Sequence, residues 1–82
     1  VVDSSALPEA AIDDIMLSAF GSAGQRCSAL RVLFVQDDIA DHLLSLLKGA
    51  METLVVGDPQ AFATDLGSVI DEDARQKLTA HI

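Results

Sequence analysis

Apolar residues recur at helical spacing near the start of the chain. Pro8 suits the first turn of a helix, because the N–H that proline lacks would have no partner there. The apolar positions that follow fall at i, i+3, i+4, i+7 and i+8; they are Ile12, Ile15, Met16, Ala19 and Phe20. The pattern predicts a helix that starts near Leu7 and stops at residues 21–24, which contain two glycines.

The next apolar segments predict a strand and a second helix. Residues 32–35 read Val-Leu-Phe-Val without polar alternation, which is typical of a strand covered on both faces in a parallel sheet. The period of so short a run does not settle the matter alone. Asp37 and Asp38 are good helix caps. Helical spacing then continues through Ile39, Leu43, Leu46, Leu47, Ala50, Met51 and Leu54, so we expect a helix over residues 38–54.

The two ends of the chain complete the predicted order of elements. Val1 and Val2 have the character of a strand end, and residues 60–67 are expected to form a loop after a turn at 57–59. Asp71 is a candidate cap for a third helix, whose acidic residues precede its basic ones. The sequence thus predicts an α/β fold in one partial domain, residues 1–82, with the order strand, helix, cysteine loop, strand, helix, loop, helix.

Composition excludes several classes of partner. The net charge is −8 with a pI near 4.2, so nucleic acid and anionic bilayers would be repelled. No apolar run reaches the ~20 residues that span a membrane. A single cysteine and no signal segment indicate a reducing, cytoplasmic location. The length of 82 residues and the absence of an initiator Met suggest part of a larger protein.

Cys27 is the only cysteine and the first candidate for chemistry. It follows a flexible turn and a basic residue, which is how a nucleophile can be presented. Nucleophilic work requires the thiolate, and Arg26 and nearby backbone N–H groups are the local candidates for stabilising it. The alternative is structural, because a lone cysteine in a soluble domain is more often a small buried hydrophobe.

Residues 24–29, which read Gly-Gln-Arg-Cys-Ser-Ala, resemble the active-site cysteine motif of the aldehyde dehydrogenase superfamily. Residues 2–9, 28–33 and 64–71 are similar to one branch of it. That branch contains the L-glutamate γ-semialdehyde (1-pyrroline-5-carboxylate) dehydrogenases, especially the module of bacterial bifunctional proline utilisation A proteins. Position 68 is Ser where that branch leads us to expect Pro; the difference lies away from the thiol.

The resemblance implies a role for three neighbouring residues. Cys27 would attack the substrate aldehyde, the thiohemiacetal would pass a hydride to NAD, and water would hydrolyse the thioester. The backbone N–H of Cys27 would stabilise the oxyanion. Ser28 would help to anchor the substrate carboxylate. Arg26 is a weaker substrate-site candidate, and a purely structural role explains it equally well.

The same resemblance implies that much of the machinery lies elsewhere. The family's catalytic Glu, its oxyanion-binding Asn and its cofactor domain occupy segments upstream of the position matching Val1. No Gly-x-Gly-x-x-Gly occurs here, so we expect NAD to be bound by other parts of the parent protein and the isolated chain to be inactive. Expected partners are the small aldehyde, the remainder of the parent and a second copy in a homo-oligomer. A fused proline dehydrogenase domain is a further candidate.

Two other hypotheses stay open on sequence alone. The chain could be a small acidic helical carrier or interaction module with Ser68 as the modified residue, although a carrier serine directly follows Asp and Ser68 follows Gly67. It could also be a structural helical piece with an inert thiol. His42 and His81 are too far apart in sequence to predict a metal site. The paired acids at 13–14 and 37–38 are best explained as helix caps and solvated faces.

Overall fold

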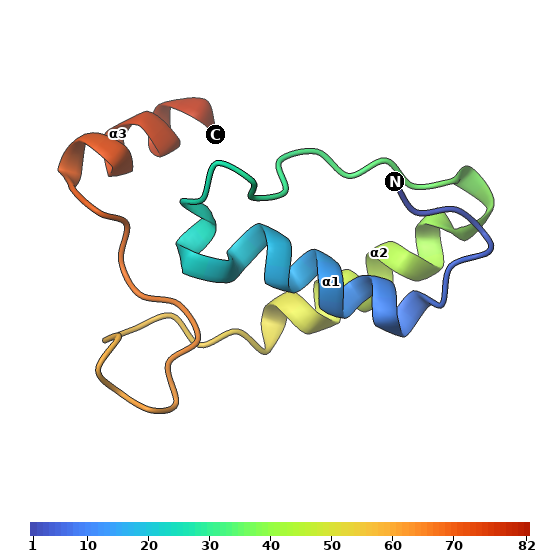
Figure 1. The fold of residues 1–82 in the computed structure, drawn as a ribbon, viewed down its shortest axis with the longest axis horizontal. Helices are drawn as coiled ribbons and strands as arrows, with labels where there is room; N and C mark the ends of the chain where they lie inside the picture. The colour runs from blue at the N-terminus through green and yellow to red at the C-terminus, as the bar shows by residue number, and fades with distance from the viewer.

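The structure is a computed structural model that describes residues 1–82 throughout. The elements in chain order are α1 (Pro8–Phe20), η1 (Gly21–Gly24), α2 (Asp37–Glu52) and α3 (Glu72–His81). Helices α1 and α2 pack against each other, whereas α3 stands apart at the other end of the molecule (Figure 1). The molecule measures 40 × 29 × 19 Å. The core therefore lies between two helices, and the last helix adds nothing to it.

Helix α1 forms where the sequence predicts it. Pro8 occupies the start of the helix, and Gly21 follows its last residue. Ile12 and Ile15 are its two buried side chains. They form a core cluster with Val2 and Leu43, and Leu43 is only 1% exposed. Burying side chains of this size contributes roughly 1.5–3 kcal/mol each, so these few residues hold α1 on α2.

Helix α2 confirms the second predicted helix, with one change at its start. The helix begins at Asp37, and the capping position is Gln36, whose side chain makes no cap hydrogen bond. Asp37 and Asp38 therefore lie in the first turn and are not caps. Negative charge there still favours the helix, because it faces the positive end of the helix dipole.

The predicted α/β fold is wrong, because the chain contains three helices and no strand. A single parallel bridge joins Val2 to Val35. In it the N–H of Val2 donates to Phe34 O at 2.8 Å and the N–H of Gln36 donates to Val2 O at 2.9 Å. The pairing ends after one residue because the turn that follows Asp3 diverts the chain into α1.

The extended segment over residues 30–36 also differs from a strand covered on both faces. Leu33 and Val35 pack against the core cluster. Val32 and Phe34 point to the other side and are 64% and 66% exposed. The apolar run is thus extended but covered on one face only, and the bridge to Val2 is its single ladder contact.

The C-terminal part contains the predicted loop and the predicted third helix. A bridge between Val56 and Leu66 closes the loop. Asp71 caps α3 by accepting a hydrogen bond from the N–H of Ala74 at 2.8 Å, as expected. None of the three helices combines the length and apolar character that crossing a membrane would require.

Candidate active site

The turn before Cys27 has an unusual backbone. Ser22, Ala23 and Gly24 all have positive φ angles, of 54°, 55° and 68°. This left-handed region disfavours side chains, by about 1–2 kcal/mol per residue. The third position differs from the other two in the space available, because a Cβ on Gly24 would lie 2.9 Å from Ala19 O. The turn reverses the chain immediately after α1 and brings the next residues back alongside it.

Cys27 is the first central residue of a second turn. The N–H of Ala29 donates to Arg26 O at 3.1 Å, which makes Cys27 and Ser28 the two central residues of a four-residue turn. The following N–H, that of Leu30, donates to Ser18 O at 3.1 Å and ties the turn to α1. Cys27 thus lies in the connection after the first helix, as predicted, and its thiol is exposed. It is not a buried hydrophobe.

The backbone of this turn leaves donors available. The N–H groups of Arg26, Cys27 and Ser28 donate to no acceptor within the chain. Free N–H groups are expected at the central positions, Cys27 and Ser28, because only the last N–H of the turn is used to close it. The thiol and its own N–H are therefore both free to meet a ligand.

The two other predicted site residues flank the thiol in different ways. Ser28 is exposed beside Cys27 in the turn. The Nε of Arg26 donates to Ser22 Oγ at 3.0 Å, so part of its guanidinium is engaged with the preceding turn. The structure thus brings Arg26, Cys27 and Ser28 together, and their chemical roles stay predictions.

Two further side chains hold the turn, and the sequence interpretation did not single them out. Gln25 accepts a hydrogen bond from the N–H of Ile70 at 2.7 Å, across 45 positions in the chain. The Nη1 of Arg31 donates to Gly24 O at 2.8 Å. The one available signal for Arg31 was its charge at the edge of an apolar run.

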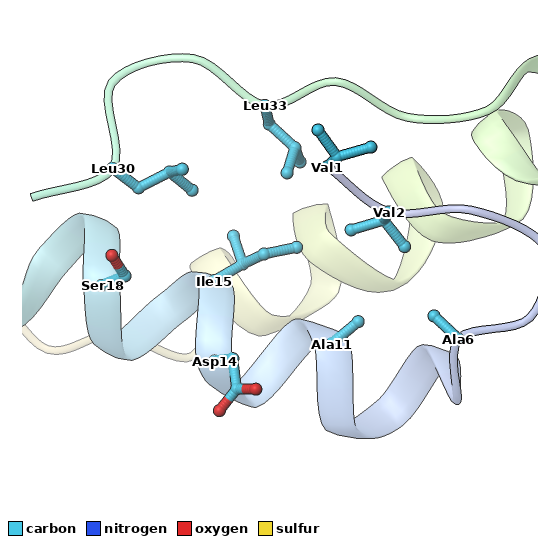
Figure 2. A pocket seen from close by; sticks show the side chains of 9 residues that line it. All are labelled: Val1, Val2, Ala6, Ala11, Asp14, Ile15, Ser18, Leu30 and Leu33. Carbon is cyan, nitrogen blue, oxygen red and sulfur yellow. The ribbon is translucent and has the colours of Figure 1, made fainter.

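Two of the hollows close to these elements differ in what lines them. One, of about 270 Å³, is lined mainly by apolar side chains of α1, the chain start and the extended segment, including Ile15, Leu30 and Leu33 (Figure 2). The other, of about 640 Å³, lies between the turn and α3 and includes Gln25 and Arg31. Cys27 lines neither of them. The thiol opens onto the surface of these 82 residues.

The residues present do not form a dinucleotide site of the Rossmann type. In that fold the dinucleotide lies over a glycine-rich turn between a strand and a helix, with the pyrophosphate at the helix N-terminus. The chain contains no such glycine pattern and no strand.

The chain belongs to the aldehyde dehydrogenase family, whose model matches residues 1–82. Over the same 82 residues it is 55% identical to the bifunctional protein PutA of Escherichia coli (strain K12) and covers 6% of that protein. It is 42% identical to the 1-pyrroline-5-carboxylate dehydrogenase of Geobacillus kaustophilus and covers 16% of it.

Solved structures agree with this assignment. A crystal structure of a bifunctional proline utilization A protein matches 94% of this chain with a TM-score of 0.91 at 56% identity, and the match spans 8% of that protein. A crystal structure of a variant of proline utilization A from Bradyrhizobium japonicum also matches with a TM-score of 0.91, at 55% identity. The match covers 94% of this chain and 8% of that protein. The chain spans a small fraction of the length of the relatives it matches.

Family membership decides against the carrier hypothesis. A carrier serine stands at the start of a helix, whereas Ser68 lies in the loop and α3 begins only at Glu72. The loop position gives Ser68 none of the surroundings that such a modification site needs.

Proposed function

We propose that the chain forms part of an NAD-dependent oxidoreductase that oxidises L-glutamate γ-semialdehyde to L-glutamate in proline catabolism, with Cys27 as its nucleophile. The similarity over the whole chain to 1-pyrroline-5-carboxylate dehydrogenases and to bifunctional PutA proteins supports this substrate. The observation that carries the proposal is the exposure of Cys27 at the head of a turn, in the Gly-Gln-Arg-Cys motif.

The chemistry begins at the sulfur. The thiolate of Cys27 forms a bond to the aldehyde carbon, and the carbonyl π electrons move to the oxygen. The free N–H of Cys27 is available to donate to that oxyanion. A donor of this kind contributes roughly 3–4 kcal/mol where it has been removed in acyl-transfer enzymes. Loss of a hydride from the carbon then leaves a thioester, and water cleaves its C–S bond and restores the thiol.

The remaining parts of the reaction lie outside these residues. NAD, held by other parts of the protein, would supply the hydride acceptor. Ser28 offers a hydroxyl and a free N–H to the substrate carboxylate, and Arg26 contributes positive charge beside the thiolate. A cytoplasmic location and assembly as a homo-oligomer belong to the same proposal, as does the inactivity of the 82 residues alone.

Substitution of the nucleophile in the full-length protein tests this function. Cys27→Ser retains the shape of the side chain but removes the thiolate. We expect NADH formation from L-glutamate γ-semialdehyde to fall by at least about a thousandfold. Ser28→Ala is the matched control on the neighbouring residue, and it should raise KM with a smaller effect on kcat. Wild-type turnover by Cys27→Ser would contradict the proposal.

A further inference from the structure

We infer that Arg31 is a positioning residue for Cys27: its guanidinium holds the backbone carbonyls of Gly24 and Arg26 and so fixes the turn that presents the thiol. The inference rests on the proposed function, because a fixed thiol matters to turnover only if the thiol is the nucleophile. Arg31 itself need not touch the substrate.

The geometry places one guanidinium against both ends of a short segment. Nη1 of Arg31 donates to Gly24 O at 2.8 Å, and Nη2 donates to Arg26 O at 3.4 Å. The first contact is a good hydrogen bond, and the second is long and weaker. Arg26 O also accepts the N–H of Ala29, the bond that closes the cysteine turn. Arg31 therefore contacts the same carbonyl that defines the conformation around Cys27.

The turn needs such support because its backbone is unfavourable. Ser22 and Ala23 are held in the left-handed region without being glycine. Conformations of this kind cost of order 1–3 kcal/mol each and persist only where the surroundings enforce them. The core does not enforce this one, since no residue of η1 is buried. Hydrogen bonds are the support that the structure shows: backbone bonds from Gln25 N–H to Ser22 O and from Leu30 N–H to Ser18 O, and side-chain bonds that include those of Arg31.

Arg31 forms no ion pair, although pairing with a carboxylate is the usual role of a surface arginine. The ion pairs of the chain both lie on α3, and Arg31 takes part in neither. Its donors go to backbone carbonyls of the turn. A planar guanidinium can reach two carbonyls at once, whereas a lysine ammonium acts as a single compact charge. The specific requirement is thus for the fork of donors and not for the positive charge alone.

The test compares three variants of the full-length protein. Arg31→Met removes the fork, Arg31→Lys keeps the charge, and Arg75→Met is the control. Arg75 pairs with Glu72 on α3, and its side chain is 59% exposed. A displacement of about 1 Å at a reacting group can reduce turnover by about a hundredfold. We expect kcat to fall by about tenfold or more in Arg31→Met, with KM changed by less than about threefold, and to be unchanged in Arg75→Met.

Two further measurements separate positioning from general stability. Guanidinium ion, added far below denaturing concentrations, should restore part of the lost kcat in Arg31→Met and should not affect Arg75→Met. Hydrogen exchange should accelerate in the peptide that covers residues 25–30 and stay unchanged in α2. Arg31→Lys should fall between Arg31→Met and wild type, because its ammonium keeps the charge and donors but not the planar fork that reaches both carbonyls.

The results distinguish this inference from the proposed function. If Cys27→Ser is inactive but Arg31→Met and Arg31→Lys both turn over at the wild-type rate, the positioning role is wrong and the nucleophile stands. If Cys27→Ser is active, the proposed function fails whatever the Arg31 variants show. Should Arg31→Met fail to fold, Arg31→Lys decides: a wild-type kcat overturns the inference, and a kcat lowered with little change in KM supports it.

Discussion

Replacing Gly24 by alanine should loosen the turn before Cys27, whereas the same change at Gly49 should strengthen helix α2. Gly24 has a φ of 68°, and a Cβ there would lie 2.9 Å from Ala19 O. A Cβ on Gly49 would meet nothing within 4 Å, and Gly49 lies inside a regular helix. The two substitutions add the same methyl group to opposite environments.

The expected magnitudes follow from these two environments. Alanine in the left-handed region costs about 1–2 kcal/mol. Crowding against a backbone oxygen adds roughly 1–3 kcal/mol, because the oxygen cannot rotate away. Together they should destabilise the turn by about 2 kcal/mol or more. At Gly49 the sign reverses, because alanine is favoured over glycine in a helix by about 1 kcal/mol.

Hydrogen exchange of the full-length protein measures both effects at single amides. The N–H of Leu30 donates to Ser18 O at 3.1 Å and reports opening of the turn. Because 1.4 kcal/mol corresponds to a factor of ten, Gly24→Ala should accelerate exchange at Leu30 by about 30-fold. Gly49→Ala should leave Leu30 unchanged and slow the amides of α2 by about fivefold.

One result would refute this reasoning. If Leu30 exchanged at the same rate in Gly24→Ala and in Gly49→Ala, the turn would not require a residue without a side chain at Gly24. The account of how Cys27 is presented would then lose its structural basis.

Two other predictions concern the C-terminal part, the first at Ile70 before α3 and the second in α3 itself. Gln25→Ala removes the acceptor of the Ile70 N–H and should accelerate exchange of that amide by about fivefold, since one hydrogen bond contributes about 1 kcal/mol. The Ala74 amide, which donates its hydrogen bond to Asp71, is the control and should be unaffected. An unchanged exchange rate at Ile70 would contradict the contact. The hydrogen bonds from Arg75 and then Gln76 hold the pKa of Glu72 below its ordinary value of 4.5. Its contribution to helix stability is therefore present above pH 4.5 and lost as pH falls through the lowered pKa. Circular dichroism of a peptide of residues 70–82 should show helicity falling on acidification and a weaker fall with Glu72→Gln; equal acid dependence in both peptides would count against the interaction.

The helices could be predicted from sequence because local signals and burial agree. Ile12 and Ile15 lie on the predicted apolar face of α1 and are buried. Asp71 stands before an acidic first turn and caps α3. In each case the chemistry that selects the helix acts within a few residues, so no knowledge of distant contacts was needed.

The strand over residues 31–36 could not be judged in the same way. An apolar run predicts burial on both faces only if partners exist on both, and that depends on distant parts of a polypeptide. Here Val2 supplies a single bridging residue, and Phe34 remains exposed. The pattern predicted a strand in a sheet, and the structure has a single bridging residue, Val35, in its place.

The candidate site was predictable in its motif and not in its supports. The position of Cys27 after the first helix follows from the glycine turn and from the family motif. The contacts of Arg31 and Gln25 could not be predicted in this way. The contact of Arg31 depends on the left-handed residues that orient Gly24 O toward it, and the contact of Gln25 is with Ile70, 45 positions away in the chain. Long-range side-chain contacts of this kind leave no periodic signal in a sequence.

The central claim is that the sulfur of Cys27 attacks the aldehyde. A single turnover of the full-length protein with L-glutamate γ-semialdehyde and NAD, stopped by acid and followed by peptide mass spectrometry, tests it most directly. The account predicts a glutamyl group attached to the peptide that contains Cys27, and none on that peptide in Cys27→Ser. An unmodified Cys27 with the glutamyl group on another residue would contradict it.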